Sequence, residues 1–343
     1  MKTKKILLLI LGIMLLGAIQ PLITVDAWNP FPTYTGYVKS KGGVPIANAD
    51  VYLYSNGHQV SSGKTASNGY YCVGSDYVNF GYIKVVKEGH ITQTKSVSSS
   101  GGTYNFYLNT RWALIVAGLE PRHVTDALGM YDTLTNFYGF TEDTIYLITW
   151  PLYRGSRRIP RDGQLSHTNI GWACGQIANR AGYGDQVVIW ILSHGETDSF
   201  ESGQAESTSA EDFDGWLDGI TCSKIYIFLG CCHSGGFIEF LNDTQNRAIY
   251  TACRSNELAN AETVHSSWAW ATYRALNSGT GPHSNAEEAD VNNDNRVSLN
   301  ELFNWAYDYI TVTKGYTDQH PKRWLGSSIG SDTDEYIGDM YYK

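Results

Sequence analysis

The chain has 343 residues, of which 42% are hydrophobic and 17% are charged, a composition typical of a globular protein with two or three domains. Its formal net charge is −9, with 25 Lys and Arg against 34 Asp and Glu. This balance excludes the broad basic surface that nucleic acids and anionic membranes attract. We therefore expect no nucleic-acid partner.

Residues 1–27 are typical of a secretory signal peptide. Lys4 and Lys5 belong to a basic start, an apolar run extends from Ile6 to Ile19, and small residues precede a cleavage position after Ala27. An uncleaved membrane anchor is the alternative, but the apolar run is shorter than the ~20 residues of a spanning helix. We expect a secreted or extracytoplasmic protein.

Export permits disulfides, and the chain contains six cysteines. Their spacing includes no CxxC pair and fits no structural zinc site. Three bridges are possible by number, but if one thiol is catalytic, at least one more stays free. The cysteines are Cys72, Cys174, Cys222, Cys231, Cys232 and Cys253.

Residues 28–110 predict an all-β sandwich, because short alternating runs are separated by glycine turns. Their order resembles the carboxypeptidase regulatory-like (transthyretin-like) domain family, which implies an accessory domain. Its tyrosines also allow a contact with glycan or a cell surface, with strand packing as the alternative. The matching motifs are Gly36-Tyr37-Val38, Pro45 to Val51, Thr65 to Tyr70 and Lys87-Glu88-Gly89.

Residues 111–343 begin with continuous apolar runs that alternate with amphipathic helical segments. This alternation predicts an α/β domain with a mostly parallel sheet and helices on both faces. In such sheets functional groups lie just beyond the carboxyl ends of the strands. Four segments should share that rim: Gly118 to His123, Ser193 to Gly195, Cys231 to His233, and the residues after Cys253.

Cys232 is the candidate nucleophile, because it follows a buried run and precedes small residues that admit a peptide carbonyl. Cys231 should point to the opposite face and pack in the core. His194 ends another apolar run, precedes Gly195, and is the candidate base. Catalysis by this pair needs no cofactor.

These two motifs resemble those of the caspase-fold (clan CD) cysteine peptidases, most nearly the legumain-like C13 family, with metacaspases close behind. The family's apolar run ending in His-Gly matches Ile189 to Gly195, and its Cys-x-Ser-Gly run matches Ile225 to Gly235. The resemblance implies a caspase-like fold, with Cys232 as nucleophile and His194 as general base and acid. It also implies an oxyanion hole from the N–H groups of Gly195 and Cys232, and it places the adjacent histidine at the rim.

The same resemblance implies substrate-binding roles for Arg122, His123 and Glu257. A guanidinium in a pocket would favour Asp or Asn before the scissile bond. A surface position at a helix start is the alternative for Arg122. The chain departs from the family at several positions, so a strict asparagine specificity does not transfer. These are Glu120 for an asparagine, Gly230 for an acidic residue, and Leu258 and Ala259 for two serines.

Residues 290–301 carry oxygen ligands at the spacing of an EF-hand-type loop. Asparagine replaces the usual glycine at the sixth position, and it is the next best residue for a positive φ. We expect a structural Ca²⁺, with a polar helix-capping turn as the alternative. The ligands would be Asp290, Asn292, Asp294, Arg296 (through its carbonyl), Ser298 and Glu301.

These motifs together predict an exported cysteine-type endopeptidase that hydrolyses proteins or peptides through an acyl-enzyme. Two alternatives stay open. A transpeptidase of the same fold would hand the acyl group to an amine, and a non-catalytic surface-binding protein would carry a decayed site.

Overall fold

The computed structural model describes residues 31–41, 43–76, 78–150, 152–154, 157–159, 162–277 and 286–337. The predicted signal peptide and its cleavage position lie outside the described residues. Within these ranges, no helix combines the length and the apolar character that crossing a membrane would require.

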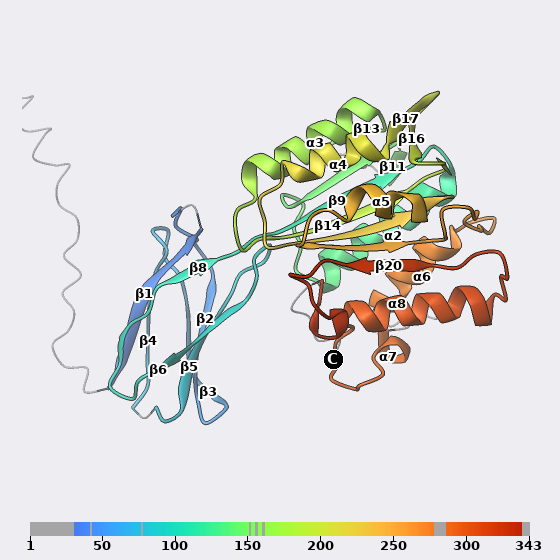
Figure 1. Ribbon diagram of the computed structural model, residues 1–343. Helices are drawn as coiled ribbons and strands as arrows, with labels where there is room; N and C mark the ends of the chain where they lie inside the picture. The colour runs from blue at the N-terminus through green and yellow to red at the C-terminus, as the bar shows by residue number, and fades with distance from the viewer. Residues whose placement is uncertain are drawn as a thin grey trace, which may run out of the picture.

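Residues 33–108 form two small sheets (Figure 1). In several of their strands, buried side chains alternate with less buried ones. Both sheets contribute to one core that includes Tyr34, Val38, Leu53, Tyr71 and Ile83. In the first sheet, β1 (Thr33–Ser40) pairs with β4 (Tyr70–Gly74), β7 (Gly102–Thr103) and β8 (Phe106–Leu108). The second has the order β3 (His58–Lys64), β2 (Asp50–Ser55), β5 (Gly81–Val86) and β6 (Gln93–Val97).

The following residues form a seven-stranded sheet that is parallel except at one edge. The predicted mostly parallel sheet is therefore confirmed, and each predicted apolar run is a buried strand. The antiparallel edge strand, β20, was not predicted. The strand order is β13 (Gly163–Gln164), β10 (Ile145–Thr149), β9 (Arg111–Ala117), β14 (Gln186–Leu192), β18 (Lys224–Gly230), β19 (Arg247–Thr251) and β20 (Lys322–Leu325).

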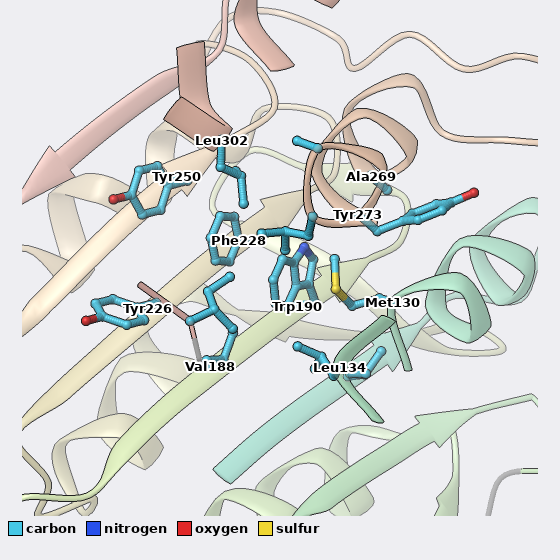
Figure 2. Packing of buried hydrophobic residues seen from close by; sticks show 14 of the residues in the cluster. Met130, Leu134, Val188, Trp190, Tyr226, Phe228, Tyr250, Ala269, Tyr273 and Leu302 are labelled. Atoms are coloured by element: carbon cyan, nitrogen blue, oxygen red, sulfur yellow. The ribbon is translucent and has the colours of Figure 1, made fainter. Parts of the chain in front are cut away.

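Helices cover both faces of this sheet, which explains why its strands are apolar throughout. On one face, Trp190, Phe228 and Tyr250 from adjacent strands stack with ring centroids 4.2 and 4.9 Å apart (Figure 2). This face packs against α2 (Pro121–Phe137), α6 (Ser267–Leu276) and α8 (Leu299–Asp308). The other face packs against α3 (His167–Arg180), α4 (Ala210–Asp218) and α5 (Phe237–Leu241).

Shorter elements complete the described chain. A three-stranded antiparallel sheet directly follows His194 and was not predicted from the sequence. Its strands are β15 (Gly195–Glu196), β16 (Ser199–Gly203) and β17 (Glu206–Ser209). The others are the hairpin of β11 (Leu152–Arg154) and β12 (Arg157–Ile159), α7 (Ala286–Ala289), a π-helical turn at Tyr309–Thr313, and 3-10 turns at Ser234–Gly236 and Asp332–Asp334.

A buried arginine of strand β19 forms ion pairs with two aspartates of helix α4. Arg247 is fully buried, and its guanidinium lies 2.5 Å from Asp214 and 2.8 Å from Asp218. A third carboxylate, of Asp243, lies 3.5 Å away. The three carboxylates are close enough together to share a metal ion. Because the guanidinium already contacts all three, we interpret the cluster as structural.

Candidate active site

The candidate histidine and cysteine follow two adjacent parallel strands. Leu192 at the end of β14 is opposite Gly230 at the end of β18. His194 and Cys232 each come two residues later, so both lie at the same edge of the sheet. A Cβ atom on Gly195 would come within 2.4 Å of the Cys232 carbonyl oxygen. The two loops therefore touch through their backbones, and this contact requires glycine.

Four of the predicted site residues line one small cleft: Arg122, His123, His194 and Cys232. The space between them is about 20 Å³, room for about one water molecule. A substrate backbone would therefore lie across the mouth of the cleft. The other walls are Ser193, Gly230, Ala259, Asn260, Ala261, Ser266 and Trp268.

Cys232 is the accessible member of the adjacent thiol pair. Its side chain is partly exposed, whereas Cys231 is fully buried and burial raises the pKa of the Cys231 thiol well above its usual value. The backbone N–H of Ala259 donates to the Cys232 Sγ at 3.4 Å. Such a donor stabilises a thiolate, the nucleophilic form. All six cysteines are free, so no disulfide restrains this thiol.

The imidazole of His194 contacts the carboxylate of Glu120, which comes from a different segment of the chain. Glu120 Oε1 lies 2.7 Å from His194 Nε2, and Glu120 Oε2 lies 2.5 Å from Arg122 Nη2. Burial acts to raise the pKa of Glu120, but the hydrogen bond with His194 and the nearby guanidinium outweigh it and lower that pKa. Glu120 is therefore ionised at neutral pH. The sequence indicated Glu120 only as a departure from the motifs of the family that the chain resembles.

His123 is buried directly beside this pair. It is 3% exposed, its ring meets that of His194 edge to face at a centroid distance of 5.2 Å, and its Nδ1 has no hydrogen-bond partner within the described part of the chain. Burial and the neighbouring His194 lower the pKa of His123 to about 4. His123 is therefore neutral at neutral pH and forms a wall of the cleft rather than a charged contact.

The charge of Arg122 is largely compensated. Its guanidinium lines the cleft, but the Glu120 carboxylate is in direct contact with it. An acidic substrate side chain would have to compete with this carboxylate for the guanidinium. The structure therefore weakens the basis for the expected preference for Asp or Asn.

Glu257 lies outside the cleft walls. Its carboxylate is 2.7 Å from His320 Nδ1 and accepts backbone N–H groups of Arg254 and His320. Burial acts to raise the pKa of Glu257, but these hydrogen bonds outweigh it and lower that pKa. These contacts fix Glu257 to the backbone of its own loop and to the segment around His320. The structure does not place Glu257 in the cleft with Arg122 and His123.

His233 follows the nucleophile but turns away from it. It adopts a left-handed backbone conformation with φ of 58°. Its Nδ1 lies 2.8 Å from the carbonyl oxygen of Ser255, so this nitrogen donates the hydrogen bond. The ring is thereby engaged with a neighbouring loop, whereas the ring of His194 faces the cleft.

The loop that forms the far wall of the cleft is fixed by a buried carboxylate. Asp126, on α2, accepts a hydrogen bond from the backbone N–H of Ser266 at 2.7 Å and contacts His265 Nδ1 at 2.6 Å. Burial raises the pKa of Asp126, and both contacts oppose that rise. Asp126 was not predicted as a site residue from the sequence, although it lies only three residues after His123.

Besides the three carboxylates around Arg247, two groups of described side chains offer metal ligands. Ligand atoms of Glu120, His123 and His194 all lie within 4.8 Å of one another. A metal ion there would engage His194 and prevent it from acting as a base. The predicted calcium loop, residues 290–301, is the second group.

In the predicted calcium loop, the side chains of Asp290 and Glu301 are buried, whereas that of Asp294 is exposed. Asp290 and Glu301 are 3% and 4% exposed. Asp290 accepts the N–H groups of Asp294 and Asn295, and Glu301 accepts those of Asn292 and Ser298. Asn295 has a φ of 67°, the conformation for which the family of such loops uses glycine. Ser298 and Glu301 form a capping box at the start of α8, and Glu301 Oε2 accepts both the N–H and the hydroxyl of Ser298. The helix-capping alternative is therefore present, and a Ca²⁺ ion at this loop stays a prediction.

Comparisons with known proteins add little. No protein-family model matches the chain, and no curated protein matches it. Among solved structures, the crystal structure of protein GSU0716 from Geobacter sulfurreducens is similar, with a TM-score of 0.39 and 12% identity. The similarity covers 63% of this chain and 93% of that one.

Proposed function

We propose that the protein is a cysteine peptidase in which Cys232 attacks a peptide carbonyl and His194 moves the proton. The observation that supports this most strongly is that His194 and Cys232 line the same cleft, with Glu120 hydrogen-bonded to the imidazole. A nucleophile, a base and a group that orients the base are the parts that thiol catalysis needs.

The reaction would proceed in two stages. His194 accepts the Cys232 proton as Sγ bonds to the carbonyl carbon, and it then donates that proton to the leaving amine as the C–N bond breaks. Water, deprotonated by His194, next attacks the thioester and releases a carboxylic acid and the free thiol. Glu120 stabilises the imidazolium that forms in each stage.

The remaining expectations belong to the same proposal. The chain would be an exported, legumain-like member of the caspase fold acting on protein or peptide substrates, with residues 28–110 as an accessory β-sandwich. The shared core of its two small sheets supports that sandwich. A contact of this sandwich with glycan or a cell surface is part of the proposal. Ca²⁺ would be held by the inward-facing carboxylates of Asp290 and Glu301 and would stiffen their loop; catalysis would need no cofactor.

Thiol labelling and cleavage assays test the proposal. Iodoacetamide should modify Cys232 at neutral pH and abolish hydrolysis of a peptide library, and Cys232→Ala should be inactive while folding normally. Cys72→Ala, which removes an exposed thiol of the small sheets, is the matched control and should be fully active. Hydrolysis that survives in Cys232→Ala would refute the proposal. Products joined to an added amine would identify a transpeptidase, and an unreactive Cys232 would indicate a binding protein.

A further inference from the structure

A second cavity is lined by His194 but not by Cys232. It is about 380 Å³ and lies over the antiparallel sheet β15 to β17. We call it the hairpin pocket. Three glutamates contribute to its walls, together with serines of the same sheet, and no lysine or arginine is among the described residues that line it. The polar side chains in its lining are those of His194, Glu196, Ser199, Glu201, Glu206 and Ser207.

Strand pairing explains why the glutamates share one face. Glu196 is paired with Ser199, and Glu201 is paired with Ser207. Ser199 and Glu201 are two residues apart on one strand, so their side chains point the same way. Phe200, between them, points to the opposite face and is fully buried in the core. The polar face is thus left to line the hairpin pocket.

Glu201 is fixed beside the base by its own backbone. Its N–H donates to the carbonyl oxygen of His194 at 3.0 Å, and its carbonyl accepts from Ser193 Oγ at 2.7 Å. Its Oε2 atom is buried and has no hydrogen-bond partner among the described residues. A buried carboxylate oxygen without a donor is unfavourable, and a cation that enters the pocket would supply one.

The charge balance of the two cavities differs. In the cleft, the Arg122 guanidinium and the Glu120 carboxylate form an ion pair. Among the described residues, the hairpin pocket brings three glutamate side chains together with the His194 imidazole, and Glu206 accepts a hydrogen bond from a neutral donor, the backbone N–H of His167, at 3.2 Å. The excess negative charge therefore favours a guanidinium or an ammonium group.

The position of the hairpin pocket indicates which side of the substrate it receives. Cys232 lines the cleft but does not line the pocket, whereas His194 lines both. In the proposed reaction His194 donates its proton to the leaving amine. The hairpin pocket therefore adjoins the group that would protonate the leaving amine, which favours binding of the residue that carries this amine.

We infer that the hairpin pocket binds an arginine or lysine side chain of the residue whose amine leaves, with Glu201 as the specificity-determining residue. This inference rests on the proposed peptidase function and names its substrate class. It is independent of the expected Asp or Asn preference, which concerns the residue on the other side of the scissile bond.

Two peptide series measure the preference. One varies the residue that supplies the leaving amine, using arginine, its neutral isostere citrulline, lysine and glutamine, and the other varies the residue before the scissile bond. We expect kcat/KM for arginine to exceed that for citrulline by about tenfold or more in the first series only. Glu201→Gln should remove this ratio, and Glu211→Gln, an exposed glutamate on α4, should retain it.

A binding arm separates this inference from the catalytic proposal. The arginine and citrulline peptides are titrated into Cys232→Ala by calorimetry, and this measurement requires no turnover. Tighter arginine binding that Glu201→Gln abolishes would support the inference even if the chain were no peptidase. Equal affinities, a ratio unchanged in Glu201→Gln, or a preference confined to the residue before the scissile bond would overturn it while leaving Cys232-dependent hydrolysis intact.

Discussion

The buried histidine beside His194 predicts how the stability of the protein depends on pH. His123 has a pKa of about 4 in the folded protein and 6.5 as a free side chain, because its burial excludes water from the charged form. At pH 7 both states are neutral. As the pH falls below 6.5 only the unfolded chain takes up the proton, so the folded state loses stability until the loss levels off below about pH 4.

The size of this loss follows from the two pKa values. A pKa difference of one is worth about 1.4 kcal/mol, so His123 should remove about 2 kcal/mol of stability by pH 5 and about 3 kcal/mol by pH 4. His123→Gln replaces the imidazole by a group that does not titrate. The difference in unfolding free energy between the two proteins should therefore shift by these amounts in favour of the variant as the pH falls.

Urea unfolding at pH 7, 6, 5 and 4 measures the effect, and comparison at each pH cancels the contributions of other groups. His58→Gln is the control, because His58 is exposed on β3. A constant difference between wild type and His123→Gln at all four values would refute the reasoning and would mean that His123 is solvated in the folded protein.

Three further predictions follow from single contacts. Glu120→Gln should lower kcat/KM by at least about tenfold, because the imidazolium loses its carboxylate; an unchanged pH–rate profile would contradict this role. Arg247→Met should reduce the free energy of unfolding by about 2 kcal/mol, since it removes the charged hydrogen bonds of a fully buried guanidinium to Asp214 and Asp218, whereas Asp243→Asn should change it by less than about 1 kcal/mol. Ca²⁺ should raise the Tm of the wild type but not that of Glu301→Gln, and a chelator without effect on the wild-type Tm would exclude a calcium site.

Much of the larger domain could be predicted because burial on both faces leaves a continuous apolar signal. The segments that became β9, β14 and β18 have such runs, and the amphipathic segments between them became helices on the two faces. The edge strand β20 and the small sheet β15 to β17 gave no comparable signal. Their strands are short and contain few apolar residues, so hydrophobicity does not distinguish them from loops.

The candidate site, like the fold, could be predicted from the sequence only in part. The ends of two apolar runs indicated His194 and Cys232, because strand order alone brings neighbouring strand ends to one rim. The partners of these residues come from other segments. Glu120 lies 74 residues from the imidazole it holds, and Ala259 lies 27 residues from the thiol to which its N–H donates. Spacing along the chain gives no information about such pairs.

The sequence by itself determined which residues carry reactive groups and that a buried parallel sheet would present them at one edge, because both depend on local residue type and on hydrophobic periodicity. The tertiary structure alone decided the electrostatics. It placed Glu120 between His194 and Arg122, and it set Glu201 beside His194 in a pocket whose described lining holds no lysine or arginine. Charges act through space over a few ångströms, and those distances are fixed only when separate segments pack together.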